Sequence, residues 1–156
     1  MTVSSEQAAK RLCERAGWTL SNLELQKQLY VAHMLHLGKT GKPLIHNHFE
    51  AWDYGPVEPS LYHKVKVFGA ESIVDIFPLS GDIDDQRSEA EALDQASEML
   101  EGASPGRLVA ITHWEDGAWA KHYDPKRRRV IIPNKDIVEE FKDRIDAAQR
   151  RKQQRH

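Results

Sequence analysis

The sequence predicts a helix-dominated α+β fold, a compact helical domain with a small antiparallel β-sheet. Apolar residues recur at helical spacing in segments that begin at serine or asparagine, whereas extended apolar segments are few, short and bounded by Gly or Pro. The chain has 156 residues, 40% of them hydrophobic, which is enough for one domain with its own core. We expect this domain to span residues 1–149, followed by a basic, disordered tail at residues 150–156.

Two helices are predicted at the start of the chain. Residues 5–15 form a short amphipathic helix capped by one of two serines that precede or open it. The clearest helix begins at Ser21, which forms a capping box with Glu24, and is predicted to end at Gly38. Apolar residues cover much of the circumference of this second helix. It should therefore lie at the centre of the core.

The middle of the chain is predicted to contain most of the sheet. Residues 44–53 and 73–77 are expected to be strands, the second stopped by a proline. Between them, Ser60 is placed to open a helix that ends at Gly69. Residues 88–101 have a thin apolar stripe and form a helix whose outer face carries acidic side chains.

The last third continues the helical pattern. Ser104 and Pro105 are favourable cap and first-turn residues for a helix to about Thr112. Residues 130–132 are predicted to add a brief strand to the sheet. Asn134 is expected to cap a last helix that carries apolar residues at helical spacing to about residue 148.

The stretch AWDYGPVEPSLY, residues 51–62, predicts a stiff corner. Gly55 is free to adopt positive φ and Pro56 has a locked φ, so the backbone path is nearly fixed. Three aromatic side chains, Trp52, Tyr54 and Tyr62, surround this junction. Such a corner serves as a packing hub or as a recognition surface, and the ease with which aromatic rings are buried favours the hub.

Composition restricts the class of protein. Cys13 is the only cysteine, which excludes an intrachain disulfide and a cysteine-based zinc site. The sequence has no signal-peptide pattern and no apolar run of membrane-spanning length. We expect a cytoplasmic protein with no membrane partner and no cofactor. It also lacks the GxSxG pattern of serine hydrolases and the glycine-rich loops that bind phosphates.

Charge is unevenly distributed although the net charge is only −2. Residues 82–101 contain eight acids and one arginine, a local balance of −7. Residues 126–156 have a balance of +6, with basic clusters at 127–129 and 150–155. Contact of this basic end with nucleic acid, as in a DNA-binding autoregulator, is one alternative function.

Histidines suggest a second alternative, a metal-dependent enzyme. His33 and His36 are three residues apart on the central helix, and His113 or His122 could complete a site with them. No HExxH pattern accompanies them, and a hydrogen-bonded core histidine is the commoner reason for a residue such as His36. His113 ends a helix, where it can bond the last carbonyls and be covered by Trp114 and Trp119.

Three sequence blocks together resemble the Panacea domain of the SocA-like antitoxin family, which also includes phage-associated GepA-like proteins. They are Leu25-x-Lys27-x-Leu29-Tyr30; Pro43-Leu44 with Glu50-Ala51-Trp52-x-x-Gly55-Pro56-Val57-x-Pro59-x-x-Tyr62; and Leu108-x-x-Ile111-Thr112-His113-x-Glu115-x-x-x-Trp119. The resemblance extends over about residues 21–141.

The resemblance implies a non-enzymatic antitoxin that neutralises a cognate toxin by protein binding, or that delivers it to an ATP-dependent protease. The acidic segment at residues 82–101 is then a candidate contact for a basic toxin. The basic tail is a candidate contact for a protease, a toxin or nucleic acid. The residues that carry the family identity and are expected to border the partner site are Tyr30, Trp52, Tyr54, Gly55, Pro56, Val57, Pro59, Tyr62, Thr112, His113 and Trp119.

Overall fold

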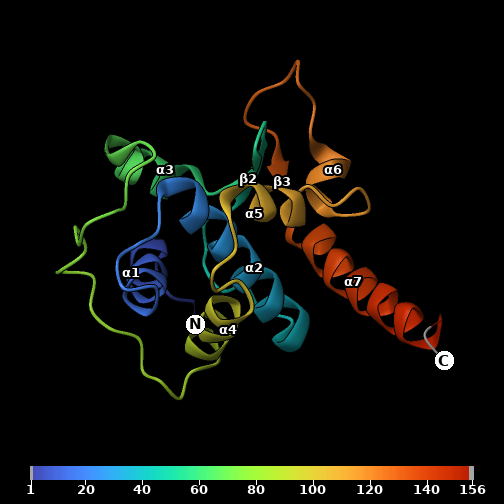
Figure 1. The fold of residues 1–156 in the computed structure, drawn as a ribbon, viewed down its shortest axis with the longest axis horizontal. Coiled ribbons are helices and arrows are strands. Elements are labelled where there is room, and N and C mark those ends of the chain that lie inside the picture. The colour runs from blue at the N-terminus through green and yellow to red at the C-terminus, as the bar shows by residue number, and fades with distance from the viewer. Residues whose placement is uncertain (1, 155–156) are drawn as a thin grey trace.

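A single long helix, α2, forms the centre of the fold. The computed structural model describes residues 2–154, and in it the other helices and a small sheet pack around α2 (Figure 1). The helices are α1 (Ser5–Arg15), α2 (Asn22–Thr40), α3 (Pro59–Val65), the 3-10 helix η1 (Lys66–Phe68), α4 (Ser88–Met99), α5 (Pro105–Thr112), α6 (Ala118–His122) and α7 (Asn134–Gln154). The strands are β1 (Phe49–Trp52), β2 (Gly55–Val57) and β3 (Ile131–Ile132). The helix-dominated α+β fold class is confirmed.

The central helix α2 is buried around nearly its whole circumference, as its sequence predicts. Its capping box is present, with both Ser21 and Glu24 bonded to the opposite backbone N–H. The predicted end at Gly38 is wrong, because α2 continues to Thr40 and ends at Gly41, which has φ +74°. Gly38 lies inside the helix, and its lack of a side chain gives room to α7, since a Cβ there would lie 2.2 Å from the ring of Phe141.

The sheet has three antiparallel strands in the order β2-β1-β3. Glu50 pairs with Val57 of β2 and with Ile131 of β3. The strand predicted at residues 73–77 is absent. Ile73 and Phe77 are buried there, but this segment is anchored by a hydrogen bond from the Ile73 N–H to the Leu20 carbonyl (2.8 Å), not by a strand ladder. The buried side chains of Ile73 and Phe77 therefore produce a strand-like apolar pattern in the sequence, although no strand forms there.

The corner after β1 is a tight β-hairpin that leads directly into α3. Gly55 and Pro56, predicted to be a turn, are paired residues of strand β2. The predicted cap Ser60 is also incorrect. Glu58 caps α3 by accepting from the Leu61 N–H, and Pro59 is the first helical residue. Pro59 needs no hydrogen-bond partner at this position, because it has no N–H.

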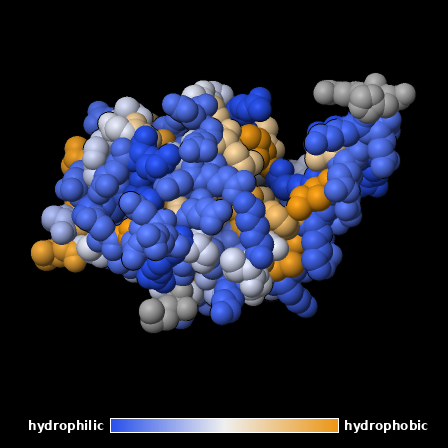
Figure 2. Space-filling model, turned by 90° about the horizontal axis from the view of Figure 1, so that it is seen from below, coloured by the Kyte–Doolittle hydropathy of each residue, from blue (hydrophilic) through white to orange (hydrophobic). Residues whose placement is uncertain are grey.

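The last helix, α7, packs on the core only through its first turns. Asn134 is its first helical residue rather than the predicted cap, and its side chain contacts His33. Ile137 and Glu140 are buried, whereas the outer part of the helix projects from the body (Figures 1 and 2). The helix continues to Gln154, beyond the expected end near residue 148, while residues 155 and 156 lie outside the described range.

Figure 2 shows a surface that is mostly hydrophilic, with apolar side chains in separate small patches. The core beneath is formed mainly by α1, α2 and α4 with the inner sides of β1 and β3. Between residues 2 and 154, no helix has the length and apolar character needed to cross a bilayer.

Candidate functional site

Lys27 lies on α2 in the first sequence block, at the place where residues of the second and third blocks meet it. Its side chain is only 1% exposed, and Nζ donates to the Pro56 carbonyl (3.1 Å). Gly55 has φ +115°, and a Cβ there would lie 3.0 Å from Thr112 Oγ1 and 3.1 Å from Lys27 Nζ. A glycine is therefore required where the hairpin crosses α2 and α5.

The Lys27 ammonium is unusual because no acid neutralises it. Within residues 2–154 no carboxylate lies within salt-bridge distance of Nζ, and the Pro56 carbonyl is its hydrogen-bond acceptor there. Burial lowers the pKa of Lys27 to about 7, since the charged form loses its hydration. Lys27 belongs to the first sequence block but was not among the predicted site residues. Nothing in the helical pattern distinguishes a buried lysine from an exposed one.

Stacked aromatic rings also hold the hairpin in place, in addition to Lys27. The His113 ring stacks on Trp119, with centroids 3.7 Å apart, and Trp119 Nε1 donates to the Trp52 carbonyl (2.7 Å). The pKa of His113 is lowered by burial and by the nearby Lys27, while a hydrogen bond to the Tyr54 backbone opposes the shift. The His113 side chain thus bonds the Tyr54 backbone rather than the predicted last carbonyls of α5, with Trp119 as its covering ring.

Trp114 does not cover His113 but belongs to a neighbouring network centred on Glu140. The Arg144 guanidinium lies over the Trp114 ring (4.8 Å) and its Nε donates to Glu140. Glu140 also accepts from the Tyr30 hydroxyl (2.7 Å). Tyr30 is therefore a fully buried core residue and lies away from any surface. Glu140 could not be predicted from the sequence, because it lies among other acids on an amphipathic helix.

A groove of about 910 Å³ runs along the outer side of the hairpin. It lies between α3 with η1, strand β1 with its turn, and the loop that joins α6 to β3, which forms the tip at the top of Figure 1. Of the predicted site residues, Trp52, Tyr54, Val57 and Tyr62 line the groove. The Trp52 and Tyr62 rings meet edge to face, 4.8 Å apart, and Tyr54 is 69% exposed.

The remaining predicted residues support the groove from behind. Gly55 and Pro56 are buried over Lys27, which is part of the groove lining. Thr112 is buried beside Gly55, and Pro59 starts α3. The sequence-predicted set thus divides into an exposed aromatic surface and a buried support, so the stiff corner is a packing hub on one side and an accessible surface on the other.

The basic loop completes the rim of the groove. Arg127, Arg128 and Arg129 all line it and are exposed. None of the three guanidinium groups has an ion-pair partner within the described chain. The backbone of Arg129 is in the left-handed region, with φ +58°, a conformation that costs free energy for any residue other than glycine.

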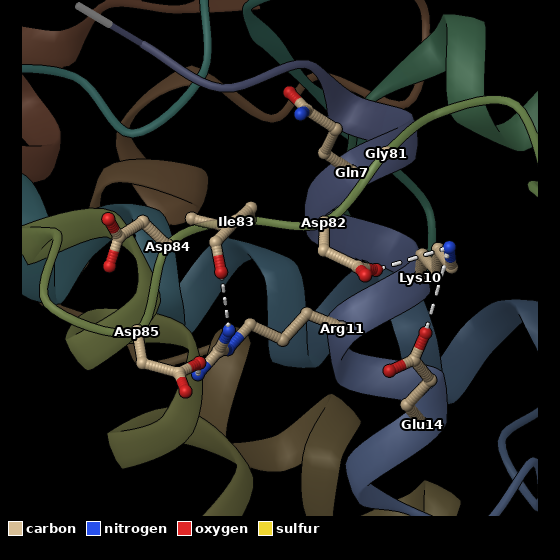
Figure 3. Close-up of a pocket in the computed structure, with 9 residues that line it drawn as sticks. All are labelled: Gln7, Lys10, Arg11, Glu14, Gly81, Asp82, Ile83, Asp84 and Asp85. Carbon is tan, nitrogen blue, oxygen red and sulfur yellow. Dashed lines mark hydrogen bonds and ion pairs between the residues drawn. The ribbon is translucent and has the colours of Figure 1, made fainter.

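The acidic segment has the opposite character, because α1 neutralises much of it. Arg11 donates to both carboxylate oxygens of Asp94 (2.8 Å each) and lies 3.0 Å from Asp85. Lys10 pairs with Asp82, as Figure 3 shows, and Arg15 pairs with Glu98. The hollow between these segments, about 370 Å³, is thus lined mostly by charges that already bind one another, with Asp84 as an exception.

The histidines of the metal alternative are engaged in other contacts. His33 Nε2 contacts Asn134 Oδ1 (3.0 Å), and burial lowers the pKa of His33 to about 4. His36 Nδ1 donates to the Lys42 carbonyl and its Nε2 contacts Ser88 Oγ, so the prediction of a hydrogen-bonded core histidine is confirmed. In the described part of the chain, no group of three His, Cys, Asp or Glu side chains is arranged to hold a metal ion.

The two basic clusters proposed for nucleic acid do not form one surface. Arg127–Arg129 lie at the α6–β3 loop at the top of Figure 1, whereas residues 150–152 lie near the outer end of α7. A continuous stripe of positive charge, as expected for a phosphate backbone, is therefore not formed by these two clusters together.

Comparison with known proteins identifies the three blocks. The family model described as "Antitoxin SocA-like, Panacea domain" matches residues 25–120. The protein named Antitoxin SocA of Caulobacter vibrioides (strain NA1000 / CB15N) is 35% identical over 136 residues, which cover 76% of this chain and 69% of that protein. No solved structure gives a significant match. The chain therefore belongs to the SocA-like antitoxin family, whose Panacea domain matches residues 25–120.

Proposed function

We propose that this protein is the antitoxin of a toxin–antitoxin system and neutralises a cognate toxin by direct protein binding in the cytoplasm. The observation that carries this proposal is membership of the SocA-like antitoxin family. The structure supports a binding role in one further respect. The aromatic rings around the family's hairpin are partly exposed over a rigid support, an arrangement suited to protein recognition.

Co-expression with the adjacent gene tests the proposal. Induction of that gene alone should stop growth, and induction together with this chain should restore colony formation. A version of this gene with an early stop codon is the control, because it separates the protein from its mRNA. Failure of the intact chain to restore growth, or a neighbour that is harmless alone, contradicts the proposed function.

Delivery of the toxin to an ATP-dependent protease is a second route to neutralisation. The outer part of α7 projects from the body and carries exposed basic side chains at residues 150–152, so it is available for a second contact while the groove is occupied. Toxin half-life after translation is stopped separates the two routes. Delivery predicts a half-life that shortens when this chain is present and recovers in cells without the protease, whereas masking predicts no change in half-life.

A further inference from the structure

The groove along the hairpin combines positive charge with aromatic walls, which together point to a partner that is both acidic and partly apolar. Its rim carries Arg127, Arg128 and Arg129, which have no ion pair within residues 2–154. The buried amine of Lys27, which has no acid beside it, is part of the lining of the groove. Its walls are the aromatic rings of Trp52 and Tyr62. A binding partner that combines carboxylates with apolar side chains would complement all three.

The loop that carries the arginines is held in place at both ends. Tyr123 stacks on Trp119 (4.6 Å) and its hydroxyl donates to Asp53 (2.6 Å). At the other end, the Ala51 N–H donates to the Val130 carbonyl (2.9 Å). The guanidinium groups are thus presented from a fixed base, and the left-handed backbone of Arg129 lies within this loop. Strained backbone of this kind is frequent at binding sites.

The acids of the groove lining are already engaged. Glu50 accepts from the Trp52 indole N–H (2.9 Å), and Asp53 accepts from the Tyr123 hydroxyl. These acids do not lie within ion-pair distance of the three arginines, which leaves the arginines available. The same acids would repel a phosphate backbone that followed the whole groove, whereas a peptide can place its carboxylates at the arginine rim alone.

We propose that the groove binds an acidic segment of the toxin, with carboxylates at Arg127–Arg129 and an apolar side chain against Trp52 and Tyr62. This inference rests on the proposed antitoxin function and specifies its contact surface. It also reverses the charge expected from the sequence, because four of the eight acids at residues 82–101 pair with α1, while the arginines of the basic loop have no ion pair in the described chain.

A charge-reversal pair provides the test. The double variant Arg127→Glu/Arg128→Glu changes two exposed groove arginines, and the control Lys42→Glu/Arg107→Glu makes the same charge change at two exposed positions outside the groove. Binding of each purified variant to the product of the adjacent gene is measured by calorimetry. We expect Kd to rise about tenfold or more for the groove variant and less than about threefold for the control. Circular dichroism and thermal unfolding verify that both variants are folded.

Each outcome has a distinct meaning. If both variants bind and neutralise as the original chain does, the groove assignment is overturned while the antitoxin function stands. Equal weakening of both variants indicates long-range attraction only and also overturns it. If the original chain does not restore growth, the proposed function itself fails, and the groove inference falls with it.

Nucleic acid is tested separately as the occupant. A fluorescein-labelled 20-nucleotide single strand is titrated into the original chain and into the groove variant at low and physiological salt. The proposal is overturned if the original chain binds the strand tightly and the groove variant does not, while both proteins bind the toxin equally well. That result would assign the arginines to nucleic acid. Weak binding that is equal in both proteins supports the peptide.

Discussion

Two regions of this molecule are both dense in charge in the sequence, but the fold pairs the charges of one and leaves those of the other without partners. In the seam between α1 and the 82–98 segment, basic and acidic side chains bind one another, as Arg11 does with Asp94 and Asp85. In the hairpin groove, three arginines and the buried Lys27 have no acidic partner in the described chain. The density of charge therefore does not identify a binding surface. What matters is which charges the fold leaves unpaired, and this depends on contacts between distant segments.

The largest expected effect is a loss of stability at Gly55, which is buried over Lys27 behind the groove. Gly55→Ala should destabilise the protein by about 3 kcal/mol, because φ +115° is strained for alanine and the new Cβ would contact Thr112 and Lys27. Gly17→Ala is the matched control: it has φ +66° with nothing within 4 Å, and should lose about 1 kcal/mol from backbone strain alone. Urea unfolding measures both. Equal losses would mean that the close approach of the hairpin to Lys27 contributes nothing.

Lys27 gives the protein a pH dependence above neutrality, whereas the lowered pKa of Asp94 in the seam acts only at acid pH. Its pKa is about 7 in the folded protein against 10.5 for an ordinary lysine. Between these values the unfolded chain binds a proton that the folded chain does not, so raising the pH stabilises the fold. From pH 7 to pH 9 this increment amounts to about 2 kcal/mol.

Lys27→Met removes that increment, so the free energies of unfolding of variant and original chain should converge as pH rises from 7 to 9. Methionine preserves the length and buries well, and at pH 7 the variant should be the more stable. The range stops at pH 9 because of Cys13, whose pKa is raised to about 12 by burial. Above pH 9 the unfolded chain loses the Cys13 proton while the folded chain keeps it, and this destabilises the fold. A parallel pH profile in both proteins would contradict an unpaired buried ammonium.

A matched pair of arginine substitutions compares the two regions directly. Arg11→Ala removes a bidentate contact with Asp94 and a bond to the Ile83 carbonyl, and should destabilise the protein by about 1.5 kcal/mol while toxin binding stays unchanged. Arg128→Ala should show the reverse, with stability unchanged within about 0.5 kcal/mol and weaker toxin binding. Thermal unfolding and calorimetry of both variants provide the comparison. Weaker toxin binding by Arg11→Ala together with lower stability of Arg128→Ala would contradict the roles assigned to the two regions.

Local signals in the sequence were sufficient for most of the helices. The capping box at Ser21 and the Ser104–Pro105 pair act within one turn of chain and were interpreted correctly. The end of α2 and the segment at residues 73–77 were misjudged, because each depends on a distant partner, Phe141 in one case and Leu20 in the other.

The candidate site was only partly predictable for the same reason. The aromatic residues of the hairpin stand together in sequence, so Trp52, Tyr54 and Tyr62 were selected and found at the groove. Lys27 and the arginine loop are separated by about a hundred residues of chain, and only the fold brings them to one groove. The pairing of Arg11 with Asp94 is equally nonlocal, which is why the acidic segment was expected to be available to a partner.

The smallest effect tests whether strain and recognition coincide at Arg129. Arg129→Gly should stabilise the protein by about 1 kcal/mol, because glycine adopts φ +58° without the steric cost of a Cβ. The same change removes a guanidinium from the rim and should weaken toxin binding. Arg128→Gly is the control, since it removes one guanidinium where positive φ is absent, and it should weaken binding without any gain in stability. Thermal unfolding and calorimetry distinguish the two. A variant that is more stable and binds less well would show that the loop retains a strained arginine for its contact with the partner, whereas unchanged binding would separate the strain from recognition.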